Sequence, residues 1–263
     1  MGEKKIMSSN SEEKDLLFYE AYEDFYDMAH KSKAFSDFCK EAYGEDFSQD
    51  GFSDISQVDM ILEYIPKDAH ILDVGCGNGA MLRYLQQKTG AYIHGFDYSK
   101  KAIKNACLLG NEKSDFQEGI IGEKEYDDNS FDLIICMDSI YFASDMTKFV
   151  NQIRRWLKPG GVLFVAYQEG DVMDKTVNSD TTVFAKAMKK IGWEYDAKDI
   201  TDKSYDMLTK KREVAIKYQD KLIAEGCASW AELLVMQTDY ILDGREKYFS
   251  NMSRYIYTAR KLD

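Results

Sequence analysis

The sequence predicts an α/β protein built around a parallel sheet with helices on both faces. Strand-like and helix-like segments alternate between residues 60 and 200, an order typical of parallel sheets. One strand candidate leads directly into a glycine-rich turn at residues 71–79, and the next ends in the carboxylate of Asp97. Ligands of such sheets bind beyond the carboxyl ends of the strands, so we expect a site at that edge.

The predicted elements follow in order along the chain. We expect strands near residues 70–74, 92–96, 115–118, 132–137 and 162–167. We expect helices between them at residues 80–88, 100–109 and 145–157. Helix N-caps are expected at Ser99 and at Ser56 with Asp59. Gly90 and the Pro159-Gly160-Gly161 cluster are expected to end helices.

Two segments lie outside this alternation. Residues 14–64 show an aromatic-rich helical pattern, and residues 203–248 predict two further helices, the second opened by Ser229 and Glu232 in capping-box spacing. Short strands are expected at residues 194–200 and 254–259. We expect one domain, 1–263, with an N-terminal helical lid (1–64), a ligand-binding core (65–202), an inserted lid (203–248) and a last strand (249–263).

The composition limits which binding partners and which cellular compartment we expect for the protein. The net charge is −12, and residues 1–60 alone hold 15 acidic and 6 basic side chains, a surface that repels nucleic acid. The run Lys210-Lys211-Arg212 is the one candidate for a basic segment that could bind nucleic acid. We interpret it as the solvent-exposed face of a helix. No apolar run approaches the roughly 20 residues of a membrane span, and no signal-peptide pattern opens the chain. Five scattered cysteines predict neither a disulfide framework nor a metal site and fit the cytoplasm.

The glycine turn, Ile71-Leu-Asp-Val-Gly-Cys-Gly-Asn-Gly79, has the layout of a binding turn. Glycine at positions 75, 77 and 79 lets the backbone turn sharply and approach a ligand. The N–H groups that open the next helix can bind an anionic group, whereas Asp73 attracts a cation. The pair suits a ligand with an amino and a carboxylate group, such as the methionine end of S-adenosylmethionine. A nicotinamide-binding turn is the alternative at this point.

Asp97 closes the second predicted strand eighteen residues after Gly79. A carboxylate at this distance from a glycine turn can accept hydrogen bonds from both hydroxyls of an adenosine ribose. An ordinary loop aspartate ahead of the Ser99 cap is the alternative interpretation.

Two further motifs distinguish an S-adenosylmethionine-binding protein from the nicotinamide-binding alternative. They are Asn129-Ser-Phe-Asp132, which enters the fourth strand, and Leu157-Lys-Pro-Gly-Gly161, which precedes the fifth. Together with the glycine turn and Asp97, they resemble the class I S-adenosylmethionine-dependent methyltransferases over residues 56–167. The resemblance implies a Rossmann-like, doubly wound sheet of seven strands whose last strand, near residues 254–259, is reversed.

The resemblance also assigns the cofactor-binding residues. Asp73, Gly75, Gly77 and Gly79 would hold the methionine moiety, Asp97 the ribose, and Tyr98 would flank the adenine. Gly119 and Ile120 stand where many relatives have Gly-Asp, so the side-chain acceptor for the adenine amino group is missing. Ile120 could still pack on adenine, with Gln117 or Glu118 supplying selectivity. Asp138, at the fourth strand tip, completes the expected cofactor set.

Candidates for the acceptor end lie at strand tips and in the first helix. Methyl transfer needs alignment and, for a protonated nucleophile, a base. We name Asp138, Tyr22 and Glu169 as candidate catalytic residues. Candidate substrate-binding residues are Tyr19, Tyr26, Tyr141 and Asp199. A buried aromatic face would account for the tyrosines equally simply.

The leading hypothesis is an enzyme that methylates a small molecule, most readily at an amine nitrogen because lid and crevice are rich in carboxylates. O- or C-methylation of an aromatic or lipid-like metabolite is the second hypothesis, and a non-catalytic S-adenosylmethionine-binding protein the third. We expect no partner among nucleic acids or membranes, and the oligomeric state does not follow from the sequence.

Overall fold

The sheet has the expected architecture. The computed structural model describes residues 11–49 and 51–262, so the first ten residues of the predicted lid lie outside the described part. Seven strands form one sheet in the order β3-β2-β1-β4-β5-β7-β6, in which only β7 runs antiparallel to its neighbours. The strands are β1 (His70–Val74), β2 (Tyr92–Asp97), β3 (Ser114–Glu118), β4 (Phe131–Met137), β5 (Leu157–Glu169), β6 (Asp196–Asp199) and β7 (Ser253–Arg260). The predicted seven-stranded, doubly wound fold is confirmed.

Alternate residues of the central strands bury their side chains on opposite faces of the sheet. Ile134 packs with helices α6 (Met146–Trp156) and α7 (Val183–Lys190), whereas Ile135 packs with α4 (Ala80–Thr89) and α5 (Lys100–Leu109). Both faces of a parallel sheet are thus covered by helices, which explains the continuous apolar runs of β4 and β5.

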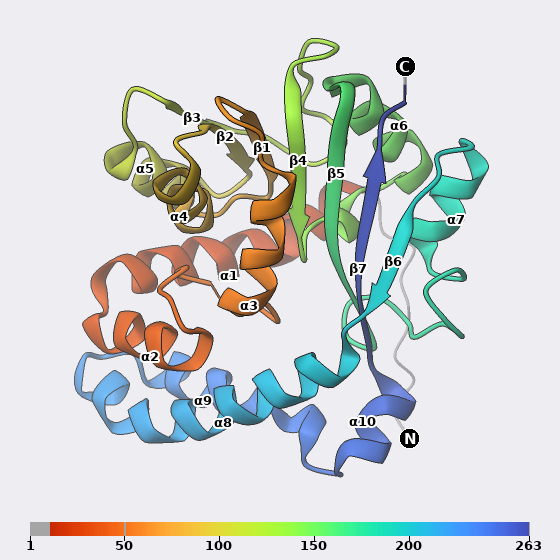
Figure 1. Ribbon diagram of the computed structural model, residues 1–263. Coiled ribbons are helices and arrows are strands. Elements are labelled where there is room, and N and C mark those ends of the chain that lie inside the picture. The colour runs from red at the N-terminus through yellow and green to blue at the C-terminus, as the bar shows by residue number, and fades with distance from the viewer. Residues whose placement is uncertain (1–10, 50, 263) are drawn as a thin grey trace.

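A third apolar cluster joins segments that are far apart in the sequence. It unites α1 (Ser11–Lys31) and α2 (Lys33–Tyr43) with α8 (Thr201–Ala224), α9 (Ala228–Met236) and α10 (Arg245–Asn251). Figure 1 shows these helices gathered beyond the carboxyl ends of the parallel strands. The Glu225 carboxylate accepts hydrogen bonds from the Ser32 hydroxyl at 2.6 Å and from the Ala34 N–H at 3.1 Å. The two predicted lid segments therefore form one helical cover.

Helix boundaries test the predicted caps. Ser99 caps α5 as predicted, and Gly90 ends α4 in a left-handed conformation. The Ser56 cap is wrong because α3 (Ile55–Val58) is capped by Asp54. The Ser229 capping box is also wrong, since α9 begins one residue earlier, at Ala228, without a side-chain cap.

Two other local features differ from the sequence-based expectation. Helix α6 ends at Trp156, so residues 157–161 belong to the start of β5 rather than to a helix end. The inserted segment contains α10 and a short 3₁₀ turn in addition to the two expected helices. Among the described residues, no helix is both long and apolar enough to cross a bilayer.

The helical cover allows a stability test. Leu208 is fully buried in the third cluster, so Leu208→Ala should lower the free energy of unfolding by about 2–5 kcal/mol through lost packing. Ile216→Ala, on the same helix but 53% exposed, should change it by less than about 0.5 kcal/mol. Urea unfolding measures both. Equal effects of the two variants would contradict the packing described here.

Candidate active site

The turn between β1 and α4 is built from glycines in a left-handed conformation. Gly75, Gly77 and Gly79 have φ angles of 75°, 54° and 72°, which only glycine adopts without strain. A Cβ atom on Gly75 would lie 2.9 Å from the Ser139 Cβ, and one on Gly77 would collide with the Tyr26 phenol. The turn therefore needs glycine both for its shape and for the close approach of its neighbours.

The N–H groups of this turn are largely used within the protein. Gly75 and Cys76 both donate to the Phe96 carbonyl, and Gly79 donates to the Cys76 carbonyl. Gly77 donates to the Asp97 carboxylate at 2.9 Å. These four groups are therefore not donors to a ligand, and the expected anion-binding N–H groups are those that open α4, beyond this turn. The bonds of the four groups instead fix the turn against the end of β2.

Asp73, at the end of β1, is a buried carboxylate without a compensating charge. It is 3% exposed, and no described residue donates a hydrogen bond to its Oδ1 atom. Burial raises the pKa of its carboxyl to about 8, and the charge of Asp97 adds to the effect. A site of this kind favours a cationic group, which would supply the missing donor and charge.

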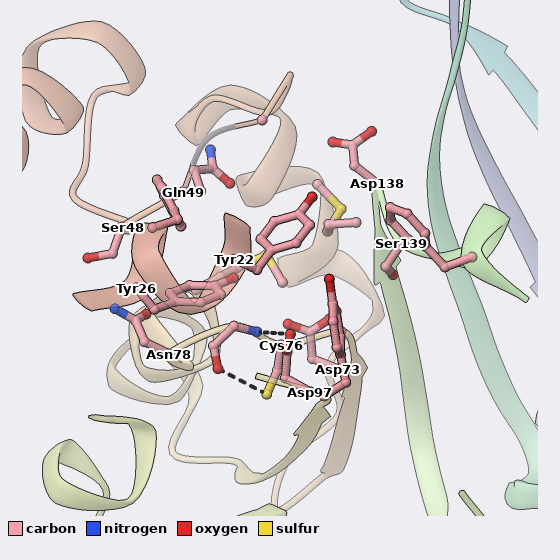
Figure 2. Close-up of a pocket in the computed structure, with 18 of the residues that line it drawn as sticks. Tyr22, Tyr26, Ser48, Gln49, Asp73, Cys76, Asn78, Asp97, Asp138 and Ser139 are labelled. Carbon is pink, nitrogen blue, oxygen red and sulfur yellow. Dashed lines mark hydrogen bonds between the residues drawn. The ribbon is translucent and has the colours of Figure 1, made fainter. Parts of the chain in front are cut away.

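Asp97 shares the cavity with Asp73, as Figure 2 shows. Burial raises the pKa of the Asp97 carboxyl to about 6, although the N–H groups of Ser99 and Gly77 oppose the shift. One oxygen accepts from Gly77 and the other from Ser99 at 2.9 Å. These bonds hold the carboxylate in one orientation at the end of β2.

The cavity lies beyond the carboxyl ends of the strands and is roofed by α1. Its empty space is about 1170 Å³, including the part open to solvent. The lining residues from the sheet side are Asp73, Gly75, Cys76, Gly77, Asn78, Met81, Asp97, Tyr98, Gly119, Ile120, Ile121, Met137, Asp138, Ser139 and Phe142. Those from the cover are Tyr22, Phe25, Tyr26, Phe47, Ser48, Gln49 and Gly51.

Helix α1 is tied to the β2–α5 turn. The Glu23 carboxylate accepts from the Ser99 hydroxyl at 2.6 Å and from the Lys101 N–H at 3.0 Å. The rings of Tyr19 and Tyr22 lie 5.6 and 6.0 Å from the ring of Tyr98. The helix thus covers the cavity above the residue that follows Asp97.

The tip of β4 carries an ion pair with a buried arginine. Asp138 accepts from both terminal nitrogens of Arg254, at 2.6 and 2.9 Å, and Arg254 is completely buried. The arginine also donates to Gln57 at 2.9 Å and to Ser53 at 2.8 Å. Asp138 is therefore a neutralised wall of the cavity rather than a free carboxylate.

The structure brings most of the predicted site residues together. The cavity-lining ones are Tyr22, Tyr26, Asp73, Gly75, Gly77, Asp97, Tyr98, Gly119, Ile120 and Asp138. Gly79 does not line the cavity but occupies the N-cap position of α4. Tyr19 and Tyr141 lie next to lining residues, Tyr141 with its ring 5.3 Å from that of Phe142.

Two predicted residues have structural partners outside the cavity. The buried Glu169 carboxylate accepts from the Thr176 N–H and the Ser253 hydroxyl, both at 3.0 Å. Asp199 accepts from the Thr201 N–H at 2.9 Å where α8 begins. Neither residue lines the cavity.

Sequence reasoning missed Arg254 and the segment ahead of α3, which supplies Phe47, Ser48, Gln49 and Gly51. A charged residue near the start of an otherwise apolar last strand was the one available signal for Arg254. The segment ahead of α3 has no motif that sequence reasoning could have used.

Comparison with known proteins agrees with this geometry. Residues 72–165 match the model of the methyltransferase domain. The chain is 24% identical over 220 residues to phosphoethanolamine N-methyltransferase of Plasmodium falciparum, covering 80% of this chain and 76% of that protein. It is 33% identical over 137 residues to ubiquinone biosynthesis O-methyltransferase of Xanthomonas oryzae, covering 49% of this chain and 51% of that protein.

Among solved structures, phosphoethanolamine N-methyltransferase 2 of Haemonchus contortus superposes with a TM-score of 0.73 at 20% identity. The match covers 92% of this chain and 60% of the Haemonchus chain, which was solved with phosphomonomethylethanolamine and S-adenosylhomocysteine. At this identity the likeness shows the fold.

The sheet order, the glycine turn and the matched domain define a methyltransferase of the Rossmann-like type. The chain is a class I S-adenosylmethionine-dependent methyltransferase, as its motifs predict.

The raised pKa of Asp73 predicts how the stability of the ligand-free protein depends on pH. Above about pH 4 the unfolded chain loses this proton, whereas the folded protein keeps it up to about pH 8. The free energy of unfolding should therefore fall as pH rises between these values, by up to about 1.4 kcal/mol per pH unit. Asp73→Asn removes this contribution.

Urea unfolding of both proteins between pH 5 and 8, without cofactor, measures the difference in slope. Asp128→Asn is the control, because that carboxylate is exposed and pairs with Arg155 at the surface. Identical slopes for the unaltered protein and Asp73→Asn would contradict the assignment.

Proposed function

We propose that the chain transfers the methyl group of S-adenosylmethionine to the nitrogen of a small amine. The observation that carries the proposal is the buried carboxylate of Asp73, which lacks a donor at one end of a roofed cavity. The similarity to phosphoethanolamine N-methyltransferases over four fifths of the chain supports nitrogen as the acceptor atom.

The residues around the cavity fit the cofactor. Asp73 would bind its ammonium group and Asp97 the two ribose hydroxyls, with Gly75 and Gly77 leaving room for its backbone contacts. Tyr98 and Ile120 would enclose the adenine, since both line the cavity. The cofactor supplies a methyl group bonded to a positively charged sulfur.

Gln117 does not fit the selectivity role suggested from the sequence. Its side-chain amide donates to Asp115 at 2.8 Å and accepts from Lys124 at 2.6 Å. Neither Gln117 nor Glu118 lines the cavity. Adenine would be held by packing against Ile120 and Ile121, without a side-chain acceptor for its amino group.

The acceptor end would be formed by Tyr22, Asp138 and Phe142. Asp138 would accept a hydrogen bond from the amine and orient its lone pair toward the methyl carbon. The amine would react in its neutral form: its lone pair forms the N–C bond while the C–S bond breaks and its electron pair stays on sulfur. The product would leave as an ammonium ion that loses its extra proton to solvent after release. The chain contributes alignment and exclusion of water, with α1 and the segment ahead of α3 as the covering elements.

O- or C-methylation is the second candidate function, favoured by the similarity to a ubiquinone biosynthesis O-methyltransferase over about half of the chain. A binding protein without turnover is the third. The acidic charge of the chain disfavours a nucleic-acid acceptor.

A methyl-transfer assay with isotopically labelled S-adenosylmethionine tests the function. We expect label on the nitrogen of a small primary or secondary amine. Label on oxygen or carbon would support the second candidate, and cofactor binding without transfer to any acceptor in a cell extract would support the third.

The cofactor assignment predicts a large effect of Asp97→Ala. Two hydrogen bonds from ribose to a buried carboxylate would be lost, so the dissociation constant for S-adenosylmethionine should rise at least 100-fold. Calorimetry measures it, with Asp115→Ala as the control because that side chain lies exposed on the neighbouring strand. Unchanged affinity of Asp97→Ala would contradict the assignment.

A further inference from the structure

We infer that the amine accepted by this cavity carries no phosphate or other anionic group. The inference rests on the proposed function and narrows its substrate class. It follows from the charges that line the cavity and from the partners of the nearest arginine.

The described lining of the cavity contains acids but no cationic side chain. Asp73, Asp97 and Asp138 line it, and none of the described lining residues is a lysine, arginine or histidine. A buried phosphate is bound by cationic side chains or by a cluster of free N–H groups. The N–H groups of Gly75, Cys76 and Gly77 already have acceptors inside the protein. The lining described here therefore repels an anionic substrate.

Arg254 pairs with Asp138 at the acceptor end, and its donors are already used. A guanidinium has five N–H groups. Asp138 takes two of them, and single bonds go to Gln57 at 2.9 Å, Ser53 at 2.8 Å and Gln168 at 3.4 Å. The Asp138 carboxylate also cancels its charge. Arg254 thus has neither charge nor donor left for a phosphate.

Two other basic side chains near the cavity bind elsewhere. Lys124 donates to the Gln117 amide oxygen at 2.6 Å and lies over the Tyr126 ring. Arg83 donates to the Asn78 carbonyl at 2.6 Å. Neither belongs to the lining residues.

The charge balance favours a cationic acceptor. With Asp138 cancelled by Arg254, and with Asp73 ionised against the bound cofactor, the carboxylates of Asp73 and Asp97 contribute two negative charges. Bound S-adenosylmethionine, with a sulfonium, an ammonium and a carboxylate, compensates one of them. The remaining charge and the aromatic walls of Tyr22 and Phe142 suit an amine on a short uncharged body. It would bind as its ammonium ion and lose one proton to solvent before its lone pair attacks the methyl carbon.

The acceptor end thus differs in charge from a site for a phosphorylated amine, the kind of ligand with which one similar structure was solved. The Haemonchus enzyme was solved with phosphomonomethylethanolamine. The described cavity of this chain offers that ligand's phosphate no counter-charge. We therefore assign the chain to unphosphorylated amines.

The test uses amine pairs whose members differ in one anionic group. The unaltered protein and labelled S-adenosylmethionine are offered ethanolamine against phosphoethanolamine, monomethylethanolamine against its phosphate, and tyramine against tyrosine. We expect kcat/KM at least 100-fold higher for the member without phosphate or carboxylate in each pair that is methylated. Equal or higher kcat/KM for the anionic member would overturn the inference and leave the proposed function intact.

Calorimetry of cofactor binding distinguishes a failure of this inference from a failure of the proposed function. Tight binding of S-adenosylmethionine with no label on any amine of the panel would overturn the proposed function and the inference together.

A variant tests the role of the ion pair. Asp138→Asn leaves the charge of Arg254 uncancelled at the acceptor end, so the ratio of kcat/KM for phosphoethanolamine to that for ethanolamine should rise at least 10-fold. Asp132→Asn is the matched control, because Asp132 lies at the opposite end of β4 and pairs with Lys158 at 2.7 Å. Circular dichroism and cofactor affinity check folding.

An unchanged ratio in a folded Asp138→Asn protein would overturn the role given to the ion pair. If the variant does not fold, the amine pairs measured on the unaltered protein decide the inference.

Discussion

The carboxylate of Asp73 is the constraint on which the site depends. A buried carboxylate without a partner destabilises the folded protein unless it is protonated or meets a cation. In this chain the carboxylate lies at the end of β1, where the glycine turn passes close to it and α1 covers the space above. The glycine conformations and the N–H bonds of the turn fix its shape beside Asp73, and the bonds from Ser99 and Lys101 to Glu23 hold α1 over the cavity.

The second organising interaction lies at the other end of the cavity. Arg254 joins the segment ahead of α3, the tip of β4, the end of β5 and the start of β7 through side-chain bonds. A buried pair of this kind contributes little net stability, because desolvation offsets the attraction, but breaking it is costly. Here the pair fixes the acceptor wall and cancels the charge of Arg254. The cover and the sheet are thereby coupled through the same residue.

Much of the fold was predictable because it rests on local patterns. The strands, the helices α4 and α5, and the Ser99 cap follow from apolar periodicity and turn residues. The predicted caps Ser56 and Ser229 each lie two residues after the observed N-caps, Asp54 and Cys227, and α9 has no side-chain cap. Local sequence offers several polar residues near each helix start and does not decide which of them is the N-cap.

The site was predictable where a motif fixes a residue's place on a strand end, as for Asp73 and Asp97. It was not predictable where position depends on long-range contacts. Glu169 follows β5 but bonds to Ser253, and the cavity wall near Phe47 comes from a segment without a motif. Arg254 pairs with Asp138, a residue 116 positions away. Such contacts become visible only once the sheet order is known.

Calorimetry of cofactor binding in two buffers of different ionisation enthalpy, at pH 6.5, tests the central claim most directly. If Asp73 is protonated in the free protein and ionised against the ammonium group in the complex, binding should release about one proton per molecule. Binding that releases no proton, or takes one up, would contradict the claim that this buried carboxylate is completed by the cationic end of S-adenosylmethionine.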